Sequence, residues 1–245
     1  MSSSAGSSAV RRSVLFILAS ASRWTAILAV LALIGVTGYV FARPTAAQTE
    51  SPAFKSQAGL TGQPEGRPRH PHVGIVAGHW GNDSGSVCAD GLTEQEVNLD
   101  IARRVMALLE TRSYRVDLLQ EFDSRLAGYQ ADALVSIHAD SCDYINDIAT
   151  GFKVARSVAS YEPETEDRLV NCIREEYETA TGLGFHENSI TPDMTSYHNF
   201  SEVTPDTPAV IVETGFLYLD RGILTDQAYR VASGIANGVM CFIGK

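Results

Sequence analysis

Three short apolar runs constrain the fold of this chain more than any other feature. Residues 73–77, 133–137 and 209–212 contain no charged side chain, so a strand formed by each can be covered on both faces. Amphipathic stretches separate the runs, which is the pattern of an α/β protein. We therefore predict a single α/β domain over residues 72–245, with a mostly parallel central sheet flanked by helices.

Weaker patterns predict the remaining elements. Thr93 and Glu96 have capping-box spacing, so a helix should begin there. Its buried stripe should advance in steps of three and four residues, through Val97, Ile101, Val105, Leu108 and Leu109. Further strands are expected at 114–119 and 151–155, and further helices at 165–181 and 225–242. His70, His72 and His186 fall in expected linker or loop and should be solvated.

The N-terminal part predicts a membrane anchor. Residues 24–42 carry no charge and can just cross roughly 30 Å of hydrocarbon as a helix. Arginines are concentrated before this segment, which places residues 1–23 in the cytoplasm and makes the chain a single-pass protein of the cytoplasmic membrane with an extracytoplasmic domain. The alternative is a signal peptide cleaved near residues 45–47, which would give a secreted protein. Residues 43–71 have the composition of a flexible linker.

The charge balance excludes one class of partner. The chain has 19 basic and 29 acidic residues and a formal net charge of -10, whereas a protein that binds nucleic acid needs a basic surface for the phosphates. No nucleic-acid partner is therefore expected.

Each of the three apolar runs is followed by a residue that can bind a metal or move a proton. His79 follows the first run, His138 the second and Glu213 the third. A single such residue is more often a solvated surface group. Three of them at the ends of strands in one sheet favour a ligand-binding site, because ligands bind at the carboxyl ends of parallel strands. Glu94 lies in the first turn of the expected helix, where the helix dipole by itself favours an acidic residue. Glu94 is nevertheless on the apolar side of that helix, which faces the sheet, and this favours a role in the same site.

These residue types point to a catalytic zinc site. Two imidazoles and one carboxylate leave a tetrahedral Zn²⁺ with a position open to water. The metal lowers the pKa of that water, and a nearby carboxylate can take its proton during attack on an amide carbonyl. Glu213 is our candidate for this base.

Four stretches of the chain resemble the signature blocks of the type 3 family of N-acetylmuramoyl-L-alanine amidases, in the family's order. They are residues 78–81 (GHWG), 91–99 (GLTEQEVNL), 136–139 (SIHA) and 213–216 (ETGF). The resemblance implies that His79, Glu94 and His138 bind zinc and that Glu213 is the catalytic glutamate. It also implies a peptidoglycan substrate, cut between N-acetylmuramic acid and L-alanine.

The chain departs from the family pattern at several positions. Trp80 and Asp140 replace the usual Gly and Asn, and the run 218–221 differs, which leaves substrate preference open. Trp80 can stack on a sugar or simply pack in the domain. Residues 190–203 are expected to form a loop, from which Tyr197 and His198 can reach the substrate; a plain surface loop is the alternative.

The four cysteines can pair if the domain lies in an oxidising compartment. Cys88 and Cys142 both follow strand-end histidines, and Cys172 and Cys241 both fall in expected helices, which favours these two pairs. The alternative that Cys88 or Cys142 binds the metal is weaker, since neither belongs to a C-x-x-C pair.

Other functions fit part of the pattern. A zinc peptidase acting on the stem peptide needs the same metal and base, and a silent wall-binding module would keep the fold but should have lost a ligand. A structural membrane protein would not need metal-binding residues at three strand ends. The sequence identifies no protein regulator.

Overall fold

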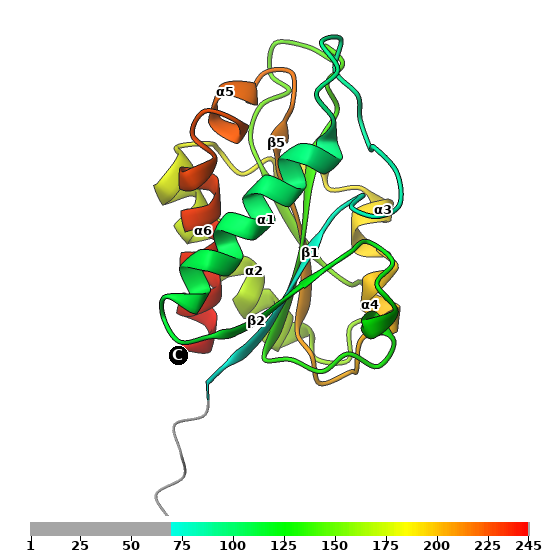
Figure 1. Ribbon diagram of the computed structural model, residues 1–245, viewed down its shortest axis with the longest axis vertical. Helices are drawn as coiled ribbons and strands as arrows, with labels where there is room; N and C mark the ends of the chain where they lie inside the picture. Colours follow the sequence, from blue (N-terminus) through cyan, green and yellow to red (C-terminus); the bar gives the residue numbers. More distant parts are fainter. Residues whose placement is uncertain (1–69, 245) are drawn as a thin grey trace, which may run out of the picture. The chain divides into compact units, whose positions relative to one another are not determined.

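A computed structural model describes residues 70–244 of the chain (Figure 1). The predicted cytoplasmic tail, the membrane or signal segment and all but the last two residues of the predicted linker lie outside this range. None of the helices formed by the described residues has both the length and the hydropathy required to cross a membrane.

The core of the domain is a five-stranded sheet in the order β2-β1-β3-β5-β4. Its strands are β1 (His72–Ala77), β2 (Arg115–Leu119), β3 (Ala133–Asp140), β4 (Lys153–Arg156) and β5 (Ala209–Phe216). Strands β2, β1, β3 and β5 are parallel, and β4 pairs antiparallel with β5 at one edge. The α/β class with a mostly parallel sheet is thereby confirmed, and the weakest predicted strand is the antiparallel one.

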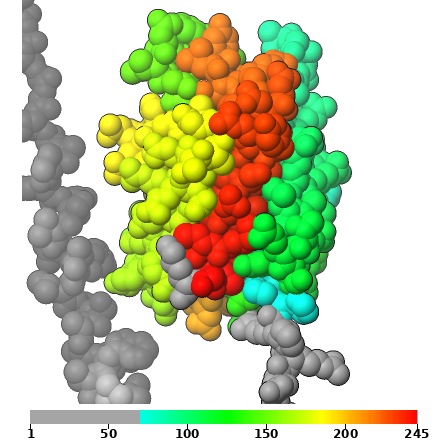
Figure 2. Space-filling model, turned by 90° about the vertical axis from the view of Figure 1, so that its left-hand side faces the viewer, coloured from blue at the N-terminus to red at the C-terminus, as the bar shows by residue number. Residues whose placement is uncertain are grey.

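Helices cover both faces of the sheet. The long helices α1 (Glu94–Glu110), α2 (Pro163–Thr181) and α6 (Ala228–Ile243) pack on one face, with α6 between the other two (Figures 1 and 2). The short helices α3 (Pro192–Thr195) and α4 (Asn199–Glu202) lie on the opposite face (Figure 1). Helix α5 (Arg221–Leu224) links β5 to α6, and 3₁₀ turns occupy Ser124–Leu126 and Glu187–Ser189.

Helix α1 begins as its sequence predicts and differs in one buried position. Thr93 is the N-cap, and both hydrogen bonds of the capping box with Glu96 are present. The buried apolar side chains recur every four residues, at Val97, Ile101, Val105 and Leu109. Because the helix has about 3.6 residues per turn, this row shifts gradually around the helix axis. Leu108 falls off this row and is 37% exposed, so its predicted burial is wrong.

Two local predictions from the sequence are also corrected. Residues 190–203 form α3 and α4 rather than a plain loop. The Thr191 hydroxyl caps α3 by accepting the backbone N–H of Met194, and one helical turn is too short to show a period. His72 is partly buried rather than solvated, because its Nε2 lies 2.7 Å from the Asp117 carboxylate.

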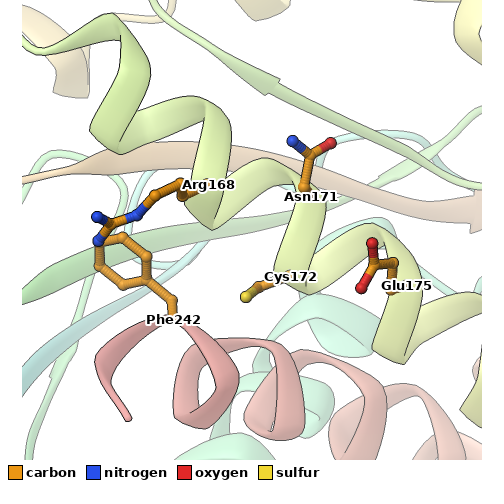
Figure 3. Close-up of a pocket in the computed structure, with 5 residues that line it drawn as sticks. All are labelled: Arg168, Asn171, Cys172, Glu175 and Phe242. Carbon is orange, nitrogen blue, oxygen red and sulfur yellow. The ribbon is translucent and has the colours of Figure 1, made fainter. Parts of the chain in front are cut away.

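Close contact between α2 and α6 depends on small residues in α6. A disulfide joins Cys172 of α2 to Cys241 of α6, and the guanidinium of Arg168 lies over the ring of Phe242 beside a shallow pocket (Figure 3). A Cβ at Gly238 would lie 2.5 Å from the Cα of Ile173. The two helices therefore pack at a distance that only glycine permits at this position.

Replacing Gly238 with Ala should destabilise the domain. Alanine favours a helix over glycine by about 1 kcal/mol, but overpacking costs about 1–3 kcal/mol. Because the clash is with backbone, the cost should lie near the upper end of that range, so we expect a net loss of about 2 kcal/mol. The free energy of unfolding from urea titration measures this loss. Gly222→Ala is the control, because a Cβ there meets nothing within 4 Å. Equal free energies of unfolding for Gly238→Ala and the wild-type protein would contradict the close packing of α2 against α6 at this position.

Candidate metal centre

Four adjacent parallel strands bring polar side chains to the same sheet edge. Glu121 lies two residues after β2, His79 two residues after β1, His138 near the end of β3 and Glu213 within the last half of β5. Parallel strands end at one edge, so residues far apart in sequence become neighbours there.

The carboxylate of Glu94 lies between the two histidines. Its Oε1 is 3.2 Å from His79 Nε2 and 3.2 Å from His138 Nδ1, and the three ligating atoms lie within 4.8 Å of one another. Burial would raise the pKa of Glu94, but the hydrogen bonds with His138 and His79 outweigh it and hold this pKa well below its usual range. Glu94 is therefore an ionised carboxylate in a buried position.

Backbone and side-chain donors fix the Glu94 carboxylate in place. Oε1 accepts the N–H of Ala139 and the side-chain amide of Asn98, each at 3.2 Å. Oε2 accepts the N–H of Ser86 at 3.1 Å. As the first residue of α1, Glu94 also faces the positive end of the helix.

His79 is held in a strained backbone conformation. Its φ of 66° lies in the left-handed region, which non-glycine residues adopt mainly where the surroundings enforce it. Its Nδ1 lies 2.6 Å from Asp83, which leaves Nε2 facing Glu94. The hydrogen bond with Glu94 is the main cause that raises the pKa of His79.

His138 is almost fully buried and packs directly on the end of β1. A Cβ at Gly78 would lie 2.4 Å from the His138 ring, so only glycine permits this approach. The second ring nitrogen, Nε2, lies 3.0 Å from the Tyr197 hydroxyl and 3.5 Å from Glu121 Oε2. Burial lowers the pKa of His138, but hydrogen bonds with Glu121 and Glu94 raise it to about 10.

This donor set fits a metal ion. Each imidazole directs one nitrogen at Glu94 and the other toward a carboxylate, Asp83 for His79 and Glu121 for His138. Histidines that bind metals are oriented in this way, by a carboxylate on the nitrogen that does not bind. The residues predicted as ligands are therefore together and suitably oriented.

Glu213 stands beside His138 on the neighbouring strand. The two residues are register partners in β3 and β5, so their side chains lie on the same face. Within residues 70–244, no hydrogen bond reaches the buried Oε2 of Glu213, and burial raises the pKa of this carboxyl to about 7. A carboxyl with such a pKa can accept and release a proton near neutral pH.

The three residues predicted to bind substrate have different surroundings. Trp80 is partly buried and packs against the main core. Tyr197 reaches the centre from the segment between α3 and α4. His198 directs Nε2 at Glu121 and Nδ1 at Glu202, each at 2.9 Å. Their substrate-binding role stays a prediction.

Glu121 belongs to the site and was missed by the sequence analysis. The same strand-end rule that identified His79 and His138 applies to β2, but its run, RVDLL, contains charged residues and is not an apolar strand. Glu121 is only 5% exposed, so its carboxylate is surrounded by the groups of the site.

The cysteines form two disulfides. Cys88 pairs with Cys142, and Cys172 pairs with Cys241, the pairing favoured by their positions in sequence. The first bond joins the loop after β1 to the loop after β3, which follow the two histidine positions. Both sulfur atoms of each pair are bonded, so the structure offers no thiolate ligand among these residues.

Comparison with known proteins identifies related chains. Residues 73–241 match the sequence profile of the family described as N-acetylmuramoyl-L-alanine amidase. The amidase LytC of Bacillus subtilis is 30% identical over 191 residues, covering 71% of this chain and 36% of LytC. The amidase AmiC of Neisseria meningitidis serogroup B is 27% identical over 221 residues, covering 71% of this chain and 53% of AmiC. The chain thus spans only about a third to a half of the length of these relatives.

A solved structure shares the fold. The amidase Ami1 of Mycobacterium smegmatis superposes with a TM-score of 0.59 at 19% identity, covering 71% of this chain and 97% of Ami1.

Metal binding should release protons. The pKa of His138 is raised to about 10 and that of His79 is raised as well, whereas a metal requires neutral imidazoles, so we expect Zn²⁺ binding at pH 7 to release protons. The apparent affinity should rise as the pH increases from 6 to 8. Calorimetric titration in buffers with different ionisation enthalpies measures the release; binding heats that are the same in all buffers would contradict it.

Proposed function

The chain belongs to the N-acetylmuramoyl-L-alanine amidase family, and on this premise we propose that its domain is a zinc amidase that cleaves peptidoglycan between N-acetylmuramic acid and L-alanine. The observation that carries the proposal is the convergence of His79 Nε2, Glu94 Oε1 and His138 Nδ1 within 4.8 Å, with Glu213 in register beside them.

His79, Glu94 and His138 would hold Zn²⁺. The ion would lower the pKa of water and polarise an amide carbonyl. Soft thiolates are absent from the set, and two imidazoles with one carboxylate are typical of catalytic zinc rather than of structural zinc.

Glu213 acts as the general base and then as the general acid. Its carboxylate accepts a proton from the water whose oxygen joins the carbonyl carbon. When the C–N bond breaks, Glu213 returns that proton to the nitrogen of the departing L-alanine. The unpartnered Oε2 and the pKa of about 7 suit both transfers at neutral pH.

The protein is proposed to act outside the cytoplasm. Two disulfides favour an oxidising compartment, and peptidoglycan lies there. Residues 24–42 would anchor the chain in the cytoplasmic membrane, with 43–71 as the linker; cleavage of the N-terminal segment would instead give a secreted enzyme.

The test incubates the purified full-length protein with isolated peptidoglycan, with Zn²⁺ or with a chelator, and identifies the new ends by mass spectrometry. The proposal requires zinc-dependent appearance of free L-alanine amino termini together with intact lactyl groups on muramic acid. New ends confined to the stem peptide would show a peptidase instead. Binding to the wall without cleavage would indicate a recognition module.

Replacing Glu213 with Gln should abolish most of the activity without loss of zinc. General acid–base catalysis contributes about 10²–10⁴-fold, so kcat should fall by about that factor while the dissociation constant for Zn²⁺ stays close to wild type. Glu175→Gln is the matched control, because Glu175 is exposed on α2, where it lines a pocket that contains none of the candidate site residues (Figure 3). Activity of Glu213→Gln within tenfold of wild type would exclude Glu213 as the base.

A further inference from the structure

The carboxylate of Glu121 contacts four other residues at the site. Oε2 accepts the backbone N–H of His79 at 2.7 Å and lies 3.5 Å from His138 Nε2. Oε1 accepts the Tyr197 hydroxyl at 2.5 Å and lies 2.9 Å from His198 Nε2. One side chain therefore connects the ends of β1 and β3 with the segment between α3 and α4.

The contacts of Oε2 orient the ligand histidines. A carboxylate on His138 Nε2 favours the proton on that nitrogen and leaves Nδ1, the nitrogen that faces Glu94, free to bind a metal. The hydrogen bond to the His79 N–H holds the backbone of the other ligand, whose φ is in the left-handed region. Glu121 thus acts on both histidines without being among the three ligands.

The contacts of Oε1 hold residues 192–202, which we call the α3–α4 segment. Tyr197 and His198 are the residues of this segment that touch Glu121, and the Tyr197 hydroxyl also lies 3.0 Å from His138 Nε2. Elsewhere the segment is fixed by packing of Met194 and Phe200 and by a hydrogen bond from Asn199 to Ser136. Its backbone carbonyls at Thr195 and Glu202 also accept the N–H groups of Val158 and Gly128. Its attachment to the metal centre runs through one carboxylate and one hydroxyl.

We propose that Glu121 is a positioning residue that couples metal binding at His138 to the order of the α3–α4 segment. His138, with His79 and Glu94, would hold the metal through Nδ1, and a ring fixed in this way would hold Tyr197 and Glu121 in one arrangement at Nε2. Coupling of this kind is reciprocal, so an ordered segment must also strengthen metal binding. Tyr197 then acts on His138 directly, and His198 acts on it through Glu121.

Loss of the Glu121 carboxylate would leave several buried donors without their acceptor. The amide of Gln has nearly the same shape, but its NH₂ cannot accept, so one of the two pairs of contacts is lost. Buried donors that lose an acceptor make their surroundings less stable. Substitutions of groups that orient metal-binding histidines typically weaken metal binding by about 10–100-fold.

The inference rests on the proposed metal centre, and its test uses two readouts other than activity. Full-length protein is stripped of metal and titrated with Zn²⁺ against a chromophoric chelator, which gives the dissociation constant. Hydrogen–deuterium exchange of peptides from residues 192–202 is then compared with and without Zn²⁺. The variants are Glu121→Gln and Tyr197→Phe, with Glu202→Gln as the control, because Glu202 contacts His198 but neither ligand histidine in the described contacts.

Glu121→Gln should raise the dissociation constant by about 10–100-fold and abolish the zinc-dependent protection of the segment. Tyr197→Phe should raise the constant less and reduce the protection, and Glu202→Gln should change neither. Zinc affinity of Glu121→Gln within twofold of wild type would overturn the inference. An equal loss of zinc affinity in Glu202→Gln would also overturn it, because any change in the α3–α4 segment would then weaken metal binding.

Tyr197→Phe keeps the test decisive if Glu121→Gln does not fold. A wild-type affinity for Zn²⁺ together with wild-type protection of residues 192–202 in Tyr197→Phe would then overturn the inference. Failure of wild-type protein to bind Zn²⁺ would overturn the metal centre and the inference together. If the wild-type protein binds Zn²⁺ tightly and cleaves peptidoglycan, and Glu121→Gln binds Zn²⁺ equally well, only the inference about Glu121 is overturned and the metal centre stands.

Discussion

The buried carboxylate of Glu94 is the constraint on which the site depends. An ionised group in such a position is tolerated only with charged or hydrogen-bonding partners on every side. Two histidines, two backbone N–H groups and the Asn98 amide fill that role. To supply them, the fold must bring the start of α1, the loop after β1 and the end of β3 to one point.

The sheet and the loops meet this requirement in different ways. Parallel strands place His138 and Glu213 as register partners, a relation set by backbone hydrogen bonds alone. The loop that carries His79 has no such regular support and is held by the Cys88–Cys142 disulfide, by Asp83 and by the hydrogen bond from the His79 N–H to Glu121. Regular structure therefore positions Glu213 and His138, while covalent and local contacts position His79.

Most of the sheet and four residues of the candidate site could be predicted from the sequence. Buried parallel strands appear as uncharged runs, and the residues that follow them meet at one edge of the sheet. His79, His138 and Glu213 were found because each follows an apolar run, and Glu94 because it lies on the apolar side of a capped helix. Glu121 obeys the same rule at the end of a strand whose run includes charges, and so it gave no clear signal. The contacts of Tyr197 depend on two single-turn helices, which are too short to produce a periodic pattern.

The strand order also bears on how the chain is completed during synthesis. Strand β5 is the last strand in sequence, yet it lies inside the sheet, between β3 and β4. A chain terminated before β5 would leave β3 with an open edge and β4 without any neighbour, and unpaired edges invite aggregation and degradation. The same strand carries Glu213, so synthesis must pass residue 216 before either the complete sheet or this carboxylate exists. Fragments that end before β5 would lack both.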